Sequence, residues 1–513
     1  MLLSTFASII FVASHCQPGP NPPHAWIAFV EASEREQASA LPDFSFAGYA
    51  FSEKPIPDVR ERPRFDVTAY RAMPDDTKYD DAGIQSAINA AEFSGGGVVF
   101  FPPGKYLISP DRDRSKYIRV SHKGIVLKGS GAGIDGTEIH MVQRRIGTRQ
   151  FVFRPKAMEQ VVAAKIVSDV TRGSFWVEVS DASTLSQGQV VVISHRSAEF
   201  TRRYFGSLPL SPEWARLSGA TGGMAIREIH TIDRIDGNRV CFHNPIQFDL
   251  IVDIAGGFYL HSYPTLADCG VEDILFTGNW DDYAEEFVHH QDAIHDSGWC
   301  ALLMQQVQNS WIRNCEFRHW NESICLDGAY ATTVQNVTLS GKKGHSSVFA
   351  RSGYGVLITE CQFQAGHHHG PGPGYGAVNT VITKCVMQTD QNIESHSGQP
   401  YATLFDDVRG GVLKNMGGPL QGLPHHGKHL VLWNFRHHSN YDFHYNFWDV
   451  LKRRNHTIAH PLLIGFQADR RITFENEGLN QRPGELVEPR SLFDAQLALR
   501  LSRRAEASKI QSE

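Results

Sequence analysis

A pattern of alternating hydrophobic and polar residues, each copy followed by a polar, glycine-rich connection, recurs along the second half of the chain. The apolar residues at one shared position of four successive copies are Ile312, Val334, Ile358 and Ile382. They are separated by 22, 24 and 24 residues, and a similar stretch around Val271 precedes them. A period in the low twenties without helical spacing is typical of the coils of a β-solenoid. Leucine-rich repeats share this period, but their L-x-x-L-x-L-x-x-N signature is absent.

Stacking these copies predicts which side chains form columns inside the solenoid. Equivalent residues of neighbouring coils lie about 4.8 Å apart, so Cys315, Val337, Cys361 and Cys385 should form one inward column. Small buried side chains that fill a narrow core account for such a column. Stacked Cα atoms also lie near disulfide-bonding distance, so a disulfide between Cys361 and Cys385 is an alternative that the spacing allows. None of the eight cysteines forms a C-x-x-C pair, which argues against a zinc ribbon or a thioredoxin-like site.

The residues before the repeats predict a strand, a helix and two further strands. A strand covers residues 65–70, and glycines 95–97 separate the helix from a buried strand at 98–101. The helical spacing is carried by Ile84, Ala87, Ile88 and Ala91. A G-x-G-x-x-G motif covers residues 131–136, but residues 137–141 after it read as a strand. Because a dinucleotide fingerprint needs a helix there, we interpret the motif as a glycine-rich β-turn.

Residues 150–250 show a different sequence pattern from the coils and predict a small inserted β subdomain. Alternating strands occur at 175–179 and 189–193, followed by a loop that contains Trp214. Two apolar runs within 226–242 are joined by an Asp-Gly-Asn turn, which indicates a β-hairpin.

Together these patterns predict an all-β fold: a right-handed parallel β-helix with an inserted small β subdomain and a short N-terminal capping helix. The expected segments are a signal peptide at 1–20, a leader at 21–60, an N-terminal β-helix module at 61–149, the inserted subdomain at 150–250, the main parallel β-helix at 251–475, and a C-terminal tail with a short helix at 476–513. The signal peptide is expected because an apolar run is followed by small residues and prolines, and it implies a secreted or periplasmic protein.

Composition narrows the classes of function. The chain has 513 residues, of which 41% are hydrophobic and 20% charged, so disorder over most of its length is not expected. Its formal net charge of −6 argues against a nucleic-acid partner. No internal apolar run approaches the roughly 18 residues of a membrane span. The 25 histidines stand out, because imidazoles at neutral pH suit proton chemistry, metal binding or a polar surface.

Three successive coils place a histidine in the same angular sector. His345, His368 and His396 follow the apolar positions of their own copies by 11, 10 and 14 residues. The polar and aromatic candidates for binding substrate around them are His367, Lys343, Arg351, Asp390, Asn392 and Tyr401, with His290, Asp296 and Trp299 on an upstream insertion. The side of a solenoid suits an extended polymer, and cations with aromatic rings suit an anionic sugar. A His-rich loop surface without function stays open as the alternative.

The sequence does not predict a transition-metal site. Residues 367–369 are three adjacent histidines, and adjacent side chains rarely converge on one ion. Calcium is the metal that the carboxylates allow, with Asp390, Glu394, Asp406 and Asp407 as its candidate ligands, although no calcium-loop motif is present.

The segment FDVTAYRAMPDDTKYDDAGIQSAINAAEFSGGGVVFFPPGKYLI, residues 65–108, resembles the N-terminal module of the pectate-lyase-like β-helix superfamily. That superfamily includes rhamnogalacturonases, polysaccharide lyases, epimerases and phage tailspikes, so the resemblance implies the fold and leaves the reaction open. Residues 390–411 and 491–501 also resemble a bacterial branch of uncharacterised pectate-lyase-like proteins. Trimers are common in parts of the superfamily, although no coiled-coil segment here predicts a homo-oligomer.

Departures from the hydrolase pattern favour a lyase. Polygalacturonase-type hydrolases carry Asn-Thr-Asp, Asp-Asp, Gly-His-Gly and Arg-Ile-Lys blocks. Here Asp390 follows Thr389 without the preceding asparagine, and no Gly-His-Gly or Arg-Ile-Lys follows Asp406. A uronide lyase needs a base for the C5 proton, a donor to the leaving oxygen, and positive charge at the carboxylate.

We therefore assign provisional roles in β-elimination on a uronic-acid polymer. His396 is the base and Tyr401 the acid, while Arg351 and His345 neutralise the substrate carboxylate. Asn392 assists them, and Asp390 orients the site. One alternative is a glycoside hydrolase that uses Asp390 with Asp406 or Asp407. Another is a non-catalytic glycan-binding or tailspike-like solenoid. In every case the expected partner is a polysaccharide or an oligosaccharide.

Overall fold

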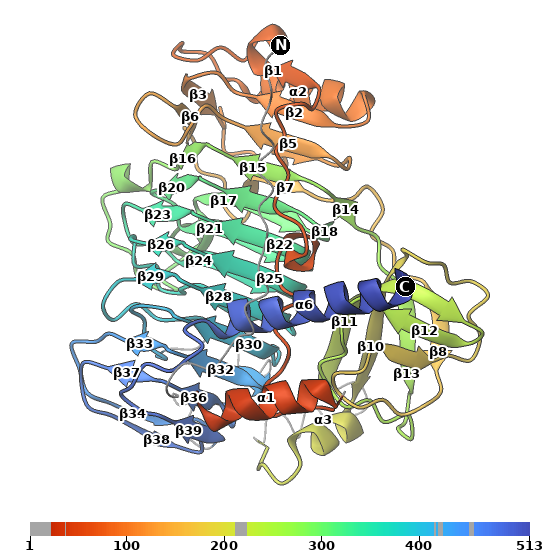
Figure 1. Ribbon diagram of the computed structural model, residues 1–513. Helices are drawn as coiled ribbons and strands as arrows, with labels where there is room; N and C mark the ends of the chain where they lie inside the picture. The colour runs from red at the N-terminus through yellow and green to blue at the C-terminus, as the bar shows by residue number, and fades with distance from the viewer. Residues whose placement is uncertain are drawn as a thin grey trace, which may run out of the picture.

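The computed structural model describes residues 22–35, 37–210, 223–414, 417–418, 424–450 and 456–512. The predicted fold class is confirmed: the chain winds into the stacked coils of a right-handed parallel β-helix, and the inserted subdomain lies against its side (Figure 1). The predicted signal peptide and the Trp214 loop lie outside the described residues. No helix among the described residues is long and apolar enough to cross a membrane.

The first of three parallel sheets extends along the whole stack. Its strands, in spatial order, are β1 (Arg64–Asp66), β2 (Gly97–Phe100), β5 (Ile125–Lys128), β15 (Gly270–Glu272), β19 (Trp311–Arg313), β22 (Tyr330–Gln335), β25 (Tyr354–Thr359), β28 (Val378–Thr383), β30 (Tyr401–Asp406), β32 (Leu430–Trp433), β36 (Leu462–Ile464) and β39 (Leu479–Gln481), with β14 (Leu266–Ala267) and β18 (Val307–Gln308) beside them.

The other two sheets complete the coils. The second contains β3 (Gly104–Ile108), β6 (Thr137–Met141), β16 (Leu275–Thr277), β20 (Glu316–Arg318), β23 (Thr338–Ser340), β26 (Gln362–Phe363) and β29 (Val386–Met387). The third contains β4 (Ile118–Val120), β7 (Arg149–Phe153), β17 (Cys300–Gln305), β21 (Glu322–Asp327), β24 (Ser346–Arg351) and β27 (Gly372–Gly374). Three strand pairs continue the last coils, namely β31 (His426–Lys428) with β35 (Ile458–Ala459), β33 (Arg436–His437) with β37 (Gln467–Ala468), and β34 (Phe443–Asn446) with β38 (Ile472–Glu475).

The predicted register of the repeats is confirmed. Ile312 pairs with Val334, Val334 with Ile358, and Ile358 with Ile382 in the first sheet. The column of Cys315, Val337, Cys361 and Cys385 is buried in the core. Cys361 and Cys385 are free thiols, so the disulfide that the stacking left open is not formed.

Helix α2 (Asp81–Phe93) caps the N-terminal end of the stack, as the helical spacing predicted (Figure 1). Its apolar residues Ile84, Ala87, Ile88 and Ala91 are fully buried. The carboxylate of Asp80 does not cap this helix; it accepts hydrogen bonds from the backbone N–H groups of Met73 and Leu107. The residues after the G-x-G-x-x-G turn form strand β6, so the interpretation as a β-turn is confirmed.

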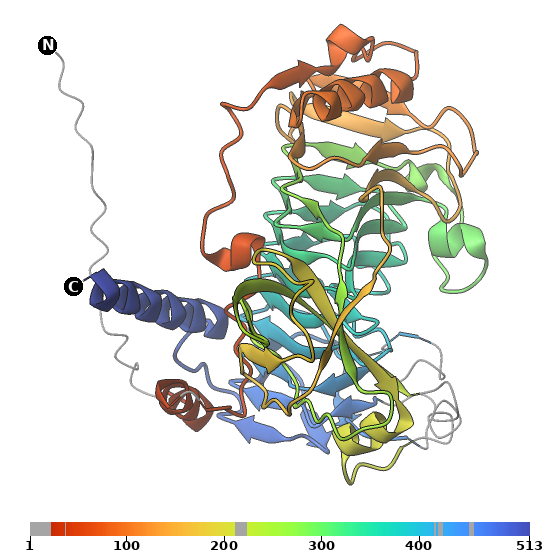
Figure 2. The same ribbon diagram turned by 90° about the vertical axis from the view of Figure 1, so that its right-hand side faces the viewer.

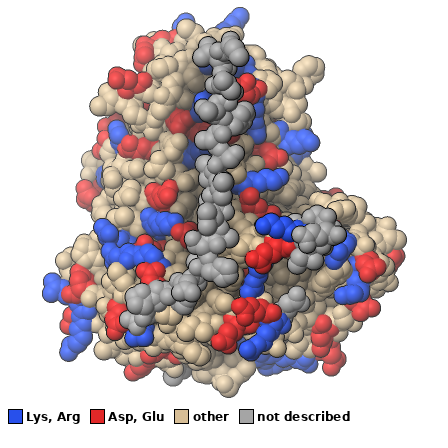
Figure 3. Space-filling view, viewed as in Figure 1, with Lys and Arg blue, Asp and Glu red and all other residues tan. Residues whose placement is uncertain are grey.

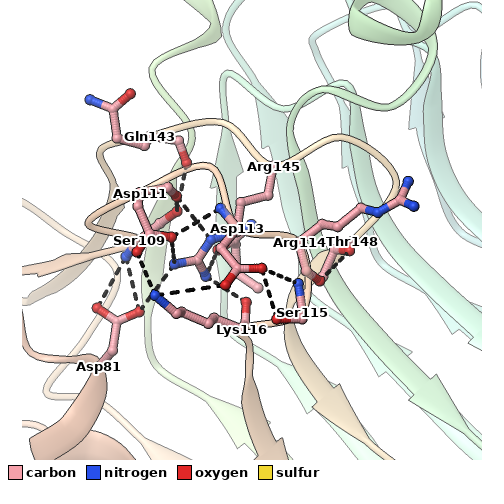
Figure 4. Close-up of polar contacts among 11 residues, drawn as sticks. Asp81, Ser109, Asp111, Asp113, Arg114, Ser115, Lys116, Gln143, Arg145 and Thr148 are labelled. Atoms are coloured by element: carbon pink, nitrogen blue, oxygen red, sulfur yellow. Dashed lines mark hydrogen bonds and ion pairs between the residues drawn. The ribbon is translucent and has the colours of Figure 1, made fainter.

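A buried arginine ties the loops of the first coils together (Figure 4). Arg145 is only 1% exposed, and it donates hydrogen bonds to the backbone carbonyls of Asp111 and Lys116. Its guanidinium also lies 3.6 Å from the Asp111 carboxylate and 3.9 Å from that of Asp81 at the start of α2. The cap helix and two loops therefore share one buried cation.

We expect Arg145→Met to lower the free energy of unfolding by about 1.5–3 kcal/mol, the usual contribution of hydrogen bonds to a charged group. Methionine fills most of the volume but leaves the carbonyls of Asp111 and Lys116 without their donor. Chemical denaturation measures the loss. Arg114→Met changes an exposed arginine in the same loop and is the matched control; equal losses in both variants would contradict the argument.

The inserted subdomain is an antiparallel sheet whose limits differ from the prediction. It comprises β8 (Val162–Ile166), β9 (Trp176–Glu178), β10 (Val190–Ser197), β11 (Met224–Asp236), β12 (Arg239–Phe242) and β13 (Phe258–Ser262), with helix α3 (Ala198–Phe205) after β10. The predicted hairpin is β11–β12. Residues 149–153 belong instead to the β-helix, because β7 pairs in parallel with β4 and β17. The insertion therefore ends at Ser262, and not at residue 250.

A column of tyrosines joins this subdomain to the first sheet. Tyr330, Tyr354 and Tyr401 are fully buried at the ends of β22, β25 and β30. Their hydroxyls donate to Asn244 Oδ1, the Pro245 carbonyl and Glu228 Oε1 respectively. The outer face of the first sheet is thus covered by protein at these coils (Figure 2).

The first and last helices of the described residues lie on the outside of the stack (Figure 1). Helix α1 (His24–Glu34) lies in the segment predicted as a leader, and α6 (Leu492–Ser512) is longer than the predicted short helix. The predicted tail also contains β39, which completes the first sheet. Short 3-10 helices are η1 (Tyr49–Ser52) and η2 (Val67–Tyr70). On the face that carries α6, cationic and anionic side chains are interspersed (Figure 3).

Candidate functional site

Histidines from three parts of the chain meet beside the third sheet. His345 directly precedes β24, and His369 belongs to the next coil, where it pairs with Ser346. His289 comes from the loop between η3 (Trp280–Asp282) and α5 (Ala293–Ser297), the light-green segment that projects from the stack in Figure 2. We call His289, His345 and His369 the histidine triad.

The ring nitrogens of the triad face one another. His289 Nε2 lies 3.2 Å from His369 Nε2, and the ring centroid of His345 lies 4.9 Å from that of His369. His345 Nδ1 donates a 2.7 Å hydrogen bond to the backbone carbonyl of Asp296, which fixes its tautomer with a lone pair on Nε2. This Nε2 atom is buried and has no hydrogen-bond partner among the described residues.

A buried carboxylate holds two histidines. Glu394, 1% exposed, accepts hydrogen bonds from His369 Nδ1 and from His396 Nδ1, the latter at 3.1 Å. The backbone N–H of Gly417 donates a further bond at 3.1 Å. Although burial acts to raise the pKa of Glu394, the charge and hydrogen bond of His369 hold it well below its usual range. Glu394 therefore stays an anion and orients both imidazoles.

Burial and crowding set the charges of the other histidines. Burial, together with the neighbouring imidazole of His369, lowers the pKa of His289 to about 4 and that of His368 to about 3. Burial likewise lowers the pKa of His345. For His369 burial acts in the same direction, but the Glu394 carboxylate more than offsets it and raises the pKa. At neutral pH the cluster therefore contains uncharged imidazoles around one anchored histidine.

His396 lies next to an exposed tyrosine and an arginine. Because its Nδ1 donates to Glu394, its Nε2 carries the lone pair. The ring centroids of His396 and Tyr375 are 5.4 Å apart, and the Arg351 guanidinium lies 4.5 Å over the Tyr375 ring. Tyr375 is 38% exposed, while the His396 side chain is 20% exposed. A base, a hydroxyl and a cation are thus gathered on the surface of consecutive coils.

Several predicted site residues belong to this region. His345 and His368 contact the ring of His289, and Arg351 and His396 contact that of Tyr375. His290 Nδ1 is hydrogen-bonded to the Asp296 carboxylate at 2.8 Å in the loop beside the triad. The sequence reasoning assigned no role to His289 or Tyr375, and it considered His369 and Glu394 only as one of three adjacent histidines and as a candidate calcium ligand. Glycines 370, 372, 374 and 376 around Tyr375 were the available signal for an unusual close approach of two coils.

Other predicted residues lie elsewhere. Tyr401, the predicted acid, is buried against the inserted subdomain with its hydroxyl on Glu228, so it is not at the surface beside His396. Asp390 accepts hydrogen bonds from Ser439 and Asn440. These positions give neither residue the role assigned from the sequence.

The remaining predicted contacts to substrate are divided between core and surface. His367 is buried and bonded to the Trp320 carbonyl, and Trp299 is buried with its Nε1 on Asn279. Asn392 is also buried, whereas Lys343 is exposed. Of these four, only Lys343 is open to solvent.

The carboxylates suggested for calcium do not converge. Asp406 accepts from the start of α6, and Asp407 forms a 2.7 Å ion pair with Arg490. Asp390 and Glu394 have the separate partners given above. Among the described residues the structure brings metal-ligating atoms together around His369, and not around these aspartates.

Removal of the Tyr401 hydroxyl tests its structural role. Tyr401→Phe should lower the free energy of unfolding by about 1–3 kcal/mol, because buried Glu228 loses a hydrogen-bond donor. Tyr375→Phe, which removes the hydroxyl of a residue that is 38% exposed, is the matched control and should change stability little in the same denaturation experiment. A stable Tyr401→Phe variant would show that the Glu228 contact contributes nothing.

Comparison with known proteins agrees with this architecture. Residues 64–172 match the family model described as "Rhamnogalacturonase A/epimerase, pectate lyase-like", and residues 366–507 match a domain of unknown function, DUF4955. The first match shows that residues 64–172 resemble the pectate-lyase-like family, and the coil geometry agrees with the parallel β-helix that this resemblance implies. Glu394, His396 and Tyr375 lie within the second match, whereas His289 and His345 lie outside both.

Individual relatives share short segments of sequence. The mannuronan C5-epimerases AlgE3 and AlgE4 of Azotobacter vinelandii are 35% and 34% identical over 80 residues, 14% of this chain. That segment is only 4% and 14% of the length of those epimerases. Among solved structures, the tailspike gp49 of Pseudomonas phage LKA1 has a TM-score of 0.45 at 12% identity, covering 79% of this chain and 70% of the tailspike. The AlgE4 A-module has a TM-score of 0.38 at 13% identity, covering 83% and 96%.

Proposed function

We propose that the protein acts on a uronic-acid-containing polysaccharide and cleaves it by β-elimination. The observation that carries the proposal is the arrangement of His396, Tyr375 and Arg351, with His396 held by the buried Glu394. The family has carbohydrate-active members, which supports a sugar polymer as the substrate. A polymer substrate also agrees with the secreted or periplasmic location that we propose from the apolar run near the N-terminus.

The reaction uses each of these groups once. His396 Nε2 removes the proton at C5, and the electron pair of that C–H bond forms the C4–C5 double bond as the C4–O bond breaks. Tyr375 donates its proton to the leaving oxygen, in the role first assigned to Tyr401. Arg351 neutralises the substrate carboxylate, where negative charge develops. Its present partner is Asp327, whose carboxylate lies 3.5 Å from Arg351 Nε, and both side chains are partly exposed.

A second candidate is C5 epimerisation of a polyuronate, favoured by the sequence match to the mannuronan C5-epimerases. Its first step is the same removal of the C5 proton. Tyr375 would then return a proton to the other face of C5, and no bond of the backbone would break. The two reactions therefore share the removal of the C5 proton and differ in which atom Tyr375 protonates, the leaving oxygen or C5.

The test is a screen of the purified full chain on uronic-acid and neutral polysaccharides in deuterated water. Ultraviolet absorbance reports the C4–C5 double bond, reducing-end assays report chain cleavage, and NMR reports deuterium at C5. Absorbance with new reducing ends supports β-elimination, whereas deuterium at C5 without cleavage supports epimerisation. Reducing ends alone mean hydrolysis and overturn the proposal. Binding without any product would favour a glycan-binding solenoid.

A further inference from the structure

The histidine triad has the geometry of a metal centre that the proposed sugar chemistry does not use. His289, His345 and His369 each offer one ligand atom, and these atoms lie within 4.8 Å of one another. A tetrahedral zinc ion with Zn–N bonds of about 2.0–2.1 Å separates its ligand nitrogens by about 3.3 Å. The 3.2 Å between His289 Nε2 and His369 Nε2 agrees with that separation.

The hydrogen bonds that His345 and His369 make through Nδ1 also favour metal binding through their Nε2 atoms. His345 Nδ1 donates to the Asp296 carbonyl, and His369 Nδ1 donates to the Glu394 carboxylate. Metal-binding histidines are commonly held in this way, with one nitrogen donating to a carbonyl or carboxylate and the other facing the ion. Both rings therefore present Nε2 to the centre of the triad.

Hydrogen bonding within the protein does not account for all three rings. His289 can donate from Nε2 to His369 Nε2, which would satisfy those two atoms without a metal. His345 Nε2 has no donor in reach among the described residues, although it is buried. Leaving a buried acceptor unsatisfied costs about 1–3 kcal/mol, and an ion at the centre removes that cost.

The loop that supplies His289 is fixed in place. Asp292 caps α5 through the backbone N–H groups of Ile294 and His295, and His295 Nδ1 accepts from the N–H of Val288. Lys342 donates a 2.7 Å bond from the coil stack to the Glu285 carbonyl. His289 therefore reaches the coils from a constrained segment, as a ligand requires.

The surrounding charge favours a cation. Glu394 lies against His369, and the Asp296 carboxylate lies in the loop beside His345. The Glu322 carboxylate lies 3.8 Å from His345 Nδ1 and is paired with Arg149. The carboxylates of Glu394 and Asp296 therefore lie beside the triad, and their partners in these contacts are histidines and not lysine or arginine.

We propose that the triad binds a divalent transition metal of the zinc class through three Nε2 atoms. Imidazole ligands suit zinc, cobalt and nickel, whereas calcium prefers oxygen ligands. Three protein ligands leave a fourth tetrahedral position for water. The second grouping, His369 with Glu394 and His396, would require His369 Nδ1, which is already bonded to Glu394.

The experiment is a cobalt titration of the full chain, purified without a histidine tag and stripped with EDTA. We expect one equivalent of Co²⁺ to produce an intense visible absorption band, and one equivalent of Zn²⁺ to abolish the band and raise Tm. Loss of a residue that only orients a metal ligand weakens binding roughly 10–100-fold. His345→Ala and His369→Ala, which remove the ligands themselves, should weaken binding by more than that. His289→Ala, in a surface loop, is the variant that tests the site without disturbing the coils.

His444→Ala is the matched control, because His444 is a half-exposed histidine on β34 bonded to Thr473, and it should bind cobalt like the wild type. A wild-type chain without a stoichiometric cobalt band overturns the proposal. So does undiminished binding in both His289→Ala and His345→Ala, or a loss confined to His396→Ala. Since no sugar is present in this titration, its result is independent of the proposed reaction.

Discussion

His396→Ala is expected to lower kcat on the polyuronate substrate about 10²–10⁴-fold, the usual contribution of a positioned general base. The side chain contacts Glu394, Phe349, Tyr375 and His369. When it is lost, Glu394 keeps its hydrogen bonds to His369 and to the backbone of Gly417. KM should change little, because Arg351 and Tyr375 remain to bind the sugar. Initial rates followed by double-bond absorbance measure the effect.

The control for this prediction is again His444→Ala, which removes an imidazole far along the chain from β27 and should leave the rate unchanged. Circular dichroism and Tm show whether His396→Ala keeps the fold. Wild-type turnover by a folded His396→Ala variant would contradict the assignment of the base. A rise in KM with unchanged kcat would mean that His396 only binds the substrate.

The fold was predictable because every coil of a β-helix has the same pattern of inward-facing and outward-facing positions. Each copy must bury the same apolar column, so the spacing of Ile312, Val334, Ile358 and Ile382 was sufficient to set the register that the structure shows. The boundary of the insertion could not be predicted from the sequence, because β7 and β13 are short apolar strands of similar composition. Only their pairing distinguishes a parallel coil from an antiparallel subdomain.

The candidate site was predictable only where it follows the repeat. His345 and His368 stack in neighbouring coils, and His396 lies in the same region, although it stacks on Gly374 and not on His368. The insertion that carries His289 was expected beside these histidines, but no role could be assigned to His289 itself because an insertion loop has no register with the coils. Tyr401 was misassigned because strand position alone does not say which face the inserted subdomain covers. Tyr375 was overlooked within a glycine-rich turn.

Two segments that resembled the same group of proteins meet in the structure. Asp406 lies in residues 390–411, and its carboxylate accepts from the backbone N–H groups of Leu492 and Phe493 at the start of α6. Ser491 and Thr383 donate to the same carboxylate. The start of the C-terminal helix is therefore tied to β30, the strand that follows His396 in the chain.

Gly372→Ala is expected to have the second large effect, on stability and on the site together. A Cβ at this position would lie 2.0 Å from the backbone carbonyl oxygen of Glu394 in the next coil. Backbone cannot move aside as a flexible side chain can, so the cost should reach or exceed the upper end of the range for overpacking, about 3 kcal/mol. Because Glu394 orients His396, the rate should fall with the stability.

Gly133→Ala is the matched control, since a Cβ there meets nothing within 4 Å and its backbone needs no positive φ. Denaturation and initial rates on both variants separate a clash between coils from a general effect of losing glycine. A Gly372→Ala protein with wild-type stability and rate would mean that the coils can separate at this point without moving Glu394. In that case the closeness of β27 to the next coil would not be what positions His396, and the hydrogen bonds of Glu394 to His369 and Gly417 would have to suffice.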